Sequence, residues 1–246
     1  MLKAVLFDFN GVIINDEPLH NKLLEQILVE ENLRPQPGEF WEACVGRSDR
    51  ACLTTLLERR GRVISDKDLD ALVARKSRYY LEEIAKLEKL PTYPGLEDLI
   101  FQIRAAHLPM GVVSGAIRVE IEQVLQQLNL TDTFSVIVAG DDIATSKPEP
   151  DGYLLAVKQL NDLSNKVGGD RPGQSIIQPE NCLAIEDTFA GVTAAKQAGM
   201  QVVGIANTYP FHMMQRCANW AVDYFTDLEL DRIRDRFSQQ SQSQGV

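Results

Sequence analysis

The stretch Lys3-Ala-Val-Leu-Phe-Asp8-Phe-Asn10-Gly11 decides the expected fold, because an apolar run ends there in a carboxylate and a glycine follows three residues later. A run rich in Val, Leu and Phe is typical of a buried strand in a parallel sheet. Asp8 would then lie at the carboxyl end of that strand. In open α/β sheets ligands bind at this edge, because loops and helix N-termini present unpaired backbone N–H groups there.

The second half of the chain alternates between strand and helix patterns. Apolar runs end at Ser114 and Ala139, and two more occupy residues 182–186 and 201–205. Helical segments separate these runs, which indicates βαβ units with right-handed crossovers. The alternating residues 220–225 suit a final edge strand. We therefore expect a doubly wound, Rossmann-like parallel sheet.

A helical insertion follows the first strand. Apolar residues recur at helical spacing from Leu19 to Leu28 and again from Leu53 to Leu57, and Asp16 is a candidate N-cap. The predicted division is an α/β core of residues 1–15 and 92–246 and an all-helical cap of residues 16–91. The polar residues 161–181 are expected to form a long loop, and the tail from residue 238 to be disordered.

Composition limits the possible partners and location. The 246 residues include 25 Lys and Arg against 35 Asp and Glu, a net charge of −10, which opposes binding to nucleic acid or to anionic membranes. No apolar run reaches the length of about 18 residues that a membrane span needs. The four cysteines lack zinc spacing and do not suggest a disulfide framework. We expect a cytoplasmic protein that is a monomer or weak dimer.

Reactive side chains follow four of the predicted strands. They are Asp8, Ser114, Lys147 in Ser-Lys-Pro-Glu-Pro, and the pair Glu186-Asp187. Parallel strands bring their carboxyl ends to one edge, so these side chains should meet. Carboxylate oxygens are the ligands that Mg²⁺ prefers, a lysine neutralises phosphate charge, and a carboxylate can act as a nucleophile. The pattern favours phosphoryl transfer on a small phosphorylated metabolite.

These four motifs, in this order, resemble those of the haloacid dehalogenase superfamily, and the insertion resembles the cap of its β-phosphoglucomutase-like phosphatases. The resemblance implies that Asp8 is the nucleophile and that Ser114 and Lys147 hold the phosphate. It also implies Mg²⁺ ligands, which would be Asp8, the Asn10 backbone carbonyl, Glu186 and Asp187. The resemblance covers the chain from Met1 to about Tyr224.

Position 10 departs from the family pattern. Phosphatase and mutase members usually carry a second aspartate there, which acts as general acid and base. Asn10 has no titratable proton near neutral pH, so it cannot perform that step. Asn10 is an engineered substitution, a natural change that another group compensates, or the mark of a binding protein. His20 is the first candidate for compensation, because similar members place a histidine there; a surface helix histidine is the alternative reading.

The cap loop Val45-Gly46-Arg47-Ser48-Asp49-Arg50 resembles the loop that reads the substrate in this family. We expect Arg47 and Arg50 to bind a second anionic group, with His20 and Gly115 also contacting the substrate. The expected activity is Mg²⁺-dependent hydrolysis of a small phosphate monoester through phospho-Asp8. A sugar phosphomutase and a catalytically weak phosphometabolite-binding protein remain as alternatives.

Overall fold

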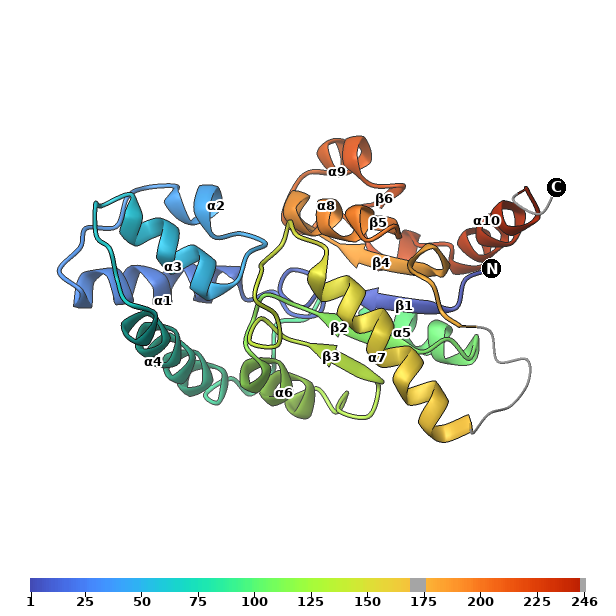
Figure 1. Ribbon diagram of the computed structural model, residues 1–246, viewed down its shortest axis with the longest axis horizontal. Helices are drawn as coiled ribbons and strands as arrows, with labels where there is room; N and C mark the ends of the chain where they lie inside the picture. The colour runs from blue at the N-terminus through green and yellow to red at the C-terminus, as the bar shows by residue number, and fades with distance from the viewer. Residues whose placement is uncertain (169–175, 244–246) are drawn as a thin grey trace.

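The computed structural model describes residues 1–168 and 176–243 and contains one parallel sheet (Figure 1). Its six strands lie in the order β3-β2-β1-β4-β5-β6. Their bounds are β1 Ala4–Phe7, β2 Met110–Val113, β3 Val136–Val138, β4 Cys182–Glu186, β5 Gln201–Ile205 and β6 Trp220–Val222. The predicted doubly wound fold is confirmed, including the edge strand that begins at Trp220.

Helices cover both faces of the sheet, which explains why its first strand is apolar throughout. Val5 and Phe7 pack on the side of α5 (Leu96–Ala105), α6 (Arg118–Gln127) and α10 (Leu230–Ser243). Ala4 and Leu6 pack on the side of α7 (Asp151–Gly168), α8 (Phe189–Gln197) and α9 (Phe211–Cys217). Successive side chains of a strand point to opposite faces, so a sheet covered twice requires apolar residues at every position.

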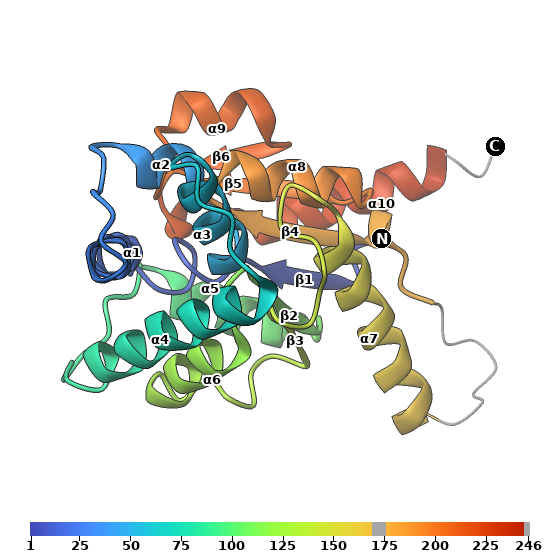
Figure 2. The ribbon, with the colours of Figure 1, turned by 60° about the vertical axis from the view of Figure 1, so that its left-hand side comes forward.

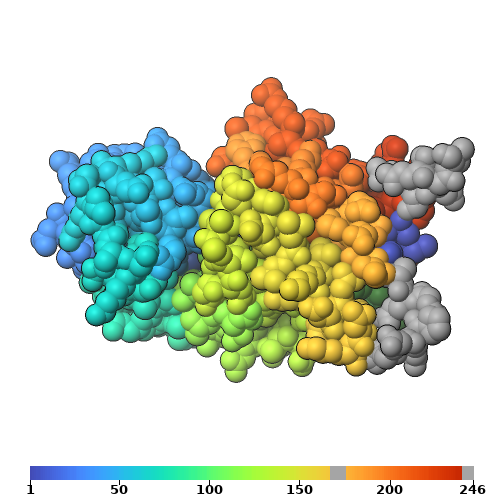
Figure 3. Space-filling model, viewed as in Figure 1, coloured from blue at the N-terminus to red at the C-terminus, as the bar shows by residue number. Residues whose placement is uncertain are grey.

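Four helices between β1 and α5 form a helical cap. They are α1 (Glu17–Glu30), α2 (Glu39–Ala43), α3 (Asp49–Glu58) and α4 (Asp66–Ile84). Figure 3 shows these residues as the blue and teal lobe on the left of the molecule. Their apolar residues make a cluster of their own, which includes Ile27, Leu53 and Leu56. The helical insertion is therefore confirmed, while its division from the core at residues 16 and 91 stays a prediction.

Several contacts join the cap to the core. Helix α4 packs against α6, as Figure 2 shows. In the cap loop, Ser48 N donates to Ser146 Oγ at 2.8 Å. Gly46 lies at φ +76°, and a Cβ there would stand 2.7 Å from Thr188 Oγ1, so this turn requires glycine. These contacts hold the cap loop over the carboxyl edge of the sheet.

Two predicted irregular segments are partly helical. Residues 161–168 continue α7, because Asn161 is anchored: its Nδ2 donates to Ile177 O at 2.9 Å, and Ile177 N donates to its Oδ1 at 2.8 Å. Residues 169–175 of the predicted loop lie outside the described residues. The predicted disorder of the tail is wrong as far as Ser243, where α10 ends, and Phe237 of this helix is buried in the core.

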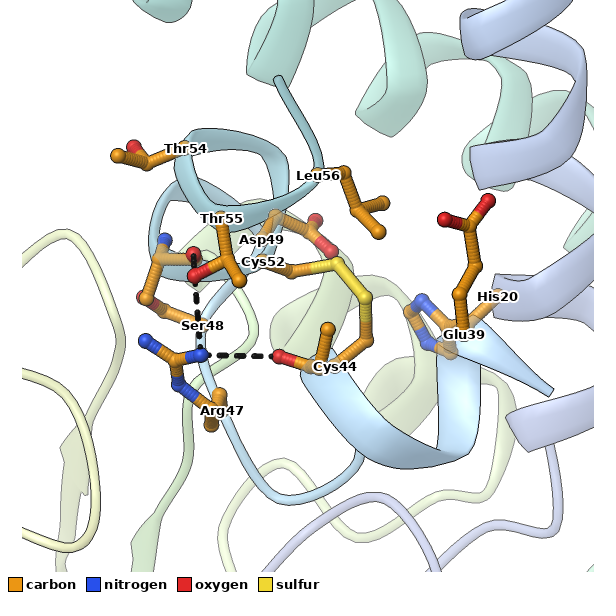
Figure 4. The surroundings of a disulfide bond; sticks show 12 residues. His20, Glu39, Cys44, Arg47, Ser48, Asp49, Cys52, Thr54, Thr55 and Leu56 are labelled. Carbon is orange, nitrogen blue, oxygen red and sulfur yellow. Dashed lines mark hydrogen bonds between the residues drawn. A yellow bond between two sulfur atoms is a disulfide. The ribbon is translucent and has the colours of Figure 1, made fainter. Parts of the chain in front are cut away.

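The cysteines also differ from expectation. Cys44 and Cys52 form a disulfide, whereas the sequence suggested none (Figure 4). The end of α2 and the first turns of α3 fold back around the Gly46 turn, which brings the two Cα atoms within 4.6 Å. Cys182 and Cys217 are free. None of the helices within residues 1–168 and 176–243 could cross a membrane. The predicted cytoplasmic location is untested.

Candidate active site

The carboxyl ends of β1 and β4 bring three acids together. Phe7 pairs with Ile185 in the parallel register, so the next residues, Asp8 and Glu186, lie at the same level. Asp187 follows directly. Each of these three side chains offers an oxygen that lies within 4.8 Å of the other two, and all three are buried. Strand register alone accounts for this convergence of acids from opposite halves of the chain.

The ammonium group of Lys147 lies between the carboxylates of Asp8 and Glu186. Its Nζ is 2.8 Å from Asp8 Oδ1 and 2.6 Å from Glu186 Oε1, in a nearly enclosed position. Burial alone would lower the pKa of Lys147, but the charges of Asp8 and Glu186 outweigh it and hold the pKa above its usual value. The ammonium group is therefore a fixed positive charge at the end of β1. Phe9 N also donates to Asp8 Oδ1, at 2.7 Å.

Ser114 and Gly115 follow β2 at the same edge. Ser114 is buried, and its Oγ accepts from Ala116 N at 3.0 Å. Gly115 borders both the cavity at Asp8 and a second pocket that Ser114 and Lys147 also line. A Cβ on Gly115 would stand 2.9 Å from the backbone of Arg47, so the glycine lets the cap loop approach. Ser114 lies beside the cavity at Asp8, while Gly115 forms part of its wall.

The acid cluster has the chemistry of a site for a hard cation. Among the described side chains, Glu186 Oε2 and Asp187 Oδ1 are buried without a hydrogen-bond partner. Burial, together with the charges of Asp8 and Glu186, raises the pKa of Asp187 well above its usual range, although Thr208 donates to it. Buried carboxylates are costly unless a cation or donors compensate them. The residues present therefore fit Mg²⁺, which prefers carboxylate and carbonyl oxygens.

The Asn10 side chain contacts the buried carboxylate of Asp16, which directly precedes the first helix of the cap. Its Nδ2 donates to both oxygens of Asp16, at 3.0 and 3.1 Å, and is 3.0 Å from His20 Nε2. Tyr80 OH donates to Asp16 Oδ2 at 2.5 Å. Asp16 precedes α1 but makes no side-chain cap bond, so its carboxylate serves this cluster instead. Although burial opposes its ionisation, His20 and the donated hydrogen bonds hold the pKa of Asp16 below its usual value.

His20 also links this cluster to a buried lysine of the cap. Its Nδ1 is 2.7 Å from Lys76 Nζ, which can only donate, so Nδ1 accepts. Lys76 Nζ is 2.7 Å from Asp49 Oδ2 and 3.4 Å from Glu120 Oε1 of the core. Burial would lower the pKa of Lys76, but Asp49 and Glu120 raise it above its usual value. The alternative reading of His20 as a surface helix histidine is therefore wrong, because its ring is buried between cap and core.

The two predicted cap arginines lie in different surroundings. Arg47 borders the cavity that Asp8, Asn10, His20 and Lys147 also line, but its Nη1 donates to Ala43 O and Thr55 Oγ1 (Figure 4). Arg50 is half exposed and forms ion pairs with Asp66 and Asp70 on the cap surface. Its side chain does not border the cavity at Asp8. Arg50 does, however, line the second pocket together with Ser114 and Lys147, so its contact with the substrate stays a prediction.

Sequence reasoning missed three residues that support the site. Asp16 was read only as a helix cap. Tyr153 has the spacing of a core residue of α7, yet its hydroxyl donates to Glu186 Oε1 at 2.5 Å. Thr208 follows β5 and donates to Asp187 Oδ2. The strand-end rule that identified Ser114 would also have identified Thr208, whereas no pattern marked Asp16 or Tyr153.

Comparisons with known proteins agree with this geometry. The model of the haloacid dehalogenase-like hydrolases matches residues 2–199. The beta-phosphoglucomutase of Bacillus subtilis (strain 168) is 28% identical over 240 residues, which cover 97% of this chain and 96% of that protein. The phosphorylated carbohydrates phosphatase of Thermotoga maritima is 26% identical over 209 residues, which cover 84% and 87%.

A solved structure shows the same fold. The crystal structure of beta-phosphoglucomutase from Clostridium difficile has a TM-score of 0.82 and 24% identity to this chain, and the match covers 98% of this chain and 99% of that one. Because the family model spans most of the chain and the fold agrees, the chain belongs to the haloacid dehalogenase-like hydrolase family.

Proposed function

We propose that this protein is a phosphatase that hydrolyses small phosphate monoesters, such as sugar phosphates, through a phosphorylated Asp8. The observation that carries the proposal is the position of the Asp8 carboxylate, which lies 2.8 Å from a buried ammonium group and within reach of two further buried acids. A nucleophilic carboxylate, a fixed cation and a cation-binding acid pair are the parts that phosphoryl transfer needs.

The proposed reaction has two displacements at phosphorus. An oxygen of Asp8 attacks the phosphorus atom, and the bond between phosphorus and the ester oxygen breaks. An acyl phosphate forms on Asp8, and the alkoxide leaves and takes a proton from water. Water then attacks that phosphorus, inorganic phosphate leaves, and the Asp8 carboxylate returns. Lys147 holds Asp8 Oδ1 and offsets the charge of the phosphoryl oxygens, and Ser114 and the Gly115 N–H are proposed to donate to those oxygens.

Mg²⁺ is the proposed cofactor. Asp8, Glu186, Asp187 and the backbone carbonyl of Asn10 would hold it. Bound there, it would offset the repulsion between the Asp8 carboxylate and the phosphate. The two unpartnered buried oxygens of Glu186 and Asp187 support this assignment.

The names of the relatives support a sugar or other small phosphorylated metabolite as substrate. The Thermotoga relative is named for phosphorylated carbohydrates, and the Bacillus relative is a phosphoglucomutase. Those names keep a phosphomutase as the second candidate function, and appearance of an isomeric sugar phosphate would identify it. His20, Gly115 and Arg47 border the cavity and are proposed to contact the substrate. Arg50 lines the neighbouring pocket with Ser114 and Lys147 and is likewise proposed to contact the substrate.

Asn10 weakens one step of the proposed reaction. Its side chain cannot protonate the leaving alkoxide or deprotonate the attacking water, and losing such a group lowers a rate by about 10²- to 10⁴-fold. We therefore propose that esters with good leaving groups react faster than alkyl phosphates. A phosphometabolite-binding protein is the third candidate, which tight binding without turnover would support.

Phosphate release tests the proposal. The chain is incubated with Mg²⁺ and with para-nitrophenyl phosphate or a panel of metabolite phosphates, with Asp8→Asn as the control. The expected result is release by the unchanged chain and none above background by the variant. Release that persists in Asp8→Asn, or no release from any compound, would overturn the proposed function.

A further inference from the structure

We propose that the Cys44–Cys52 disulfide is a reversible redox switch of the cap loop: a dithiol reductant opens the bond, and the reduced loop binds substrate more weakly. The kinetic test of this switch rests on the proposed phosphatase function, while the loop itself can be observed without turnover. The switch adds regulation to the cavity at Asp8 and gives a role to two cysteines that the proposed reaction does not use.

The disulfide spans the cap loop instead of joining distant parts of the chain. Cys44 directly follows α2, Cys52 lies in α3, and their positions in the sequence differ by eight. Arg47 and Ser48 lie on the loop that the bond closes, as Figure 4 shows. The two helices already pack in the apolar cluster of the cap, so the bond restrains the loop most directly.

The closed loop contacts the carboxyl edge of the sheet. Ser48 N donates to Ser146 Oγ at 2.8 Å, and Ser146 directly precedes the buried lysine at Asp8. Gly46 packs against Thr188, because a Cβ on Gly46 would stand 2.7 Å from Thr188 Oγ1. Thr188 directly follows the buried acid pair. A change in the loop therefore reaches both sides of the proposed phosphate site.

The bond is reached through the cavity that the substrate enters. Cys44 and Cys52 both line the cavity at Asp8, although their side chains are otherwise buried. A small dithiol therefore enters by the same opening as the substrate, and a bound substrate shields the bond. The free cysteines Cys182 and Cys217 do not border this cavity, so thiol chemistry there leaves it unaffected.

The redox step exchanges one disulfide for another. A thiolate of the dithiol attacks one of the two sulfurs, the bond between Cys44 and Cys52 breaks, and a mixed disulfide forms. The second thiol of the reductant then displaces that cysteine, and the reductant leaves as its own disulfide. Two electrons pass to the protein, and two protons end on Cys44 and Cys52. An oxidised dithiol reverses the same steps.

Closing the loop lowers the conformational entropy that substrate binding must remove. With the bond formed, the residues between Cys44 and Cys52 have few conformations to lose, whereas the reduced loop must be ordered when substrate binds. The oxidised form therefore binds substrate more tightly. Because coupling between two sites is reciprocal, bound substrate favours the disulfide by the same factor. Such couplings commonly correspond to factors of about 5 to 150.

Steady-state kinetics with para-nitrophenyl phosphate and Mg²⁺ compare the oxidised chain with the chain kept reduced by dithiothreitol. We expect KM to be at least about fivefold higher in the reduced form. The value of kcat should stay within about twofold, because no loop residue takes part in the two displacements. In Cys44→Ser/Cys52→Ser, KM should be high with or without dithiothreitol, and Cys217→Ser should keep the full response. Equal KM values in the two redox forms, or a response that survives in the double variant, overturn the switch.

The same coupling is measured in the thiol–disulfide equilibrium. Asp8→Asn, which lacks the proposed nucleophile, is equilibrated in mixtures of reduced and oxidised dithiothreitol, with and without para-nitrophenyl phosphate and Mg²⁺. Alkylation of free thiols and mass spectrometry give the fraction of chains that carry the disulfide. Saturating para-nitrophenyl phosphate should shift this equilibrium toward the disulfide by at least about fivefold. An unchanged equilibrium overturns the coupling between the bond and the cavity.

The order of the loop is measured without ligand or turnover. Backbone ¹⁵N relaxation of the oxidised chain should give order parameters of about 0.85 for Gly46 and Ser48, the value of a rigid backbone. In the reduced chain both should fall below about 0.6, while Leu6 of β1 stays rigid. Unchanged loop values refute the switch. If neither redox form hydrolyses para-nitrophenyl phosphate, the proposed phosphatase function fails, and these order parameters still decide whether the bond controls the loop.

Discussion

The sheet edge and the cap wall enclose one cavity, but they position their charges in different ways. At the sheet edge, Asp8, Glu186 and Lys147 are held by strand ends and neighbouring loops, and the ammonium group lies within 3 Å of both carboxylates. In the cap, Lys76 and Asp49 come from separate helices and meet Glu120 across the boundary with the core. In the proposed function, the reacting groups lie at the sheet edge, and the cap contributes residues that contact the substrate.

This difference predicts where a single charge matters most. Asp8→Asn should abolish phosphate release, by about 10⁴-fold or more, since a covalent mechanism cannot proceed without its nucleophile. The matched cap variant Arg59→Ala, which removes an exposed ion pair with Glu42, should change kcat/KM less than about threefold. Steady-state kinetics with para-nitrophenyl phosphate give both values. A similar loss of kcat/KM in the two variants would contradict the claim that single charges matter more at the sheet edge than in the cap.

Asn10→Asp sharpens the comparison, because Asn10 lies where the edge meets the cap. The variant supplies a titratable carboxyl group, so hydrolysis of an alkyl phosphate such as glucose 6-phosphate should rise by about 10²- to 10⁴-fold. Para-nitrophenyl phosphate, whose leaving group needs little protonation, should gain far less. Parallel phosphate-release assays measure both. If the alkyl ester is no faster, Asn10 does not stand in for a missing acid and base.

The disulfide should affect stability as well as the cap loop. Linking Cys44 to Cys52 closes a short loop, and removing such a link costs about 2–3 kcal/mol on loop entropy. We expect Cys52→Ser to lower Tm by about 5–10 °C, with Cys217→Ser as the control near zero. Thermal melts measure the change, and thiol titration of the unfolded chain should find two thiols before reduction and four after it. Four thiols in the non-reduced chain would contradict the pairing.

Metal removal tests the acids at the sheet edge. Burial and the neighbouring Asp8 raise the pKa of Glu186 from 4.5 to about 8. A carboxyl group with a raised pKa in the folded state binds its proton more tightly there, so stability is lost as pH rises from about 4.5 toward 8. We expect the Tm of chelator-treated protein to fall from about pH 5 to pH 8.

Mg²⁺ should reverse that loss, because it stabilises the ionised carboxylates. The rise in Tm on adding Mg²⁺ is therefore expected to be a few degrees larger at about pH 8 than at about pH 5. Calcium-free and magnesium-free buffers with added chelator provide the baseline. Equal shifts at both pH values would argue that Glu186 and Asp187 do not bind the ion.

Much of the fold was predictable from local patterns. The apolar run before Asp8, the strand that ends at Glu186 and the helical insertion all appear as predicted. The helical structure of two segments was not predictable, because it depends on long-range contacts. Asn161 bonds to Ile177 and anchors the extended α7, and Phe237 of the tail helix is buried in the core. The polar composition of both segments hid these contacts.

The sequence by itself determined that Asp8, Lys147 and Glu186 meet. Parallel strands place their carboxyl ends at one edge, so residues distant in the chain converge whatever the details of packing. Three contacts became known only from the tertiary structure. Asp16 accepts hydrogen bonds from Asn10, and Cys44 forms a disulfide with Cys52. Lys76 forms ion pairs with Asp49 and Glu120. Those contacts depend on how helices of the cap pack on one another and on the core, and no local spacing encodes that packing.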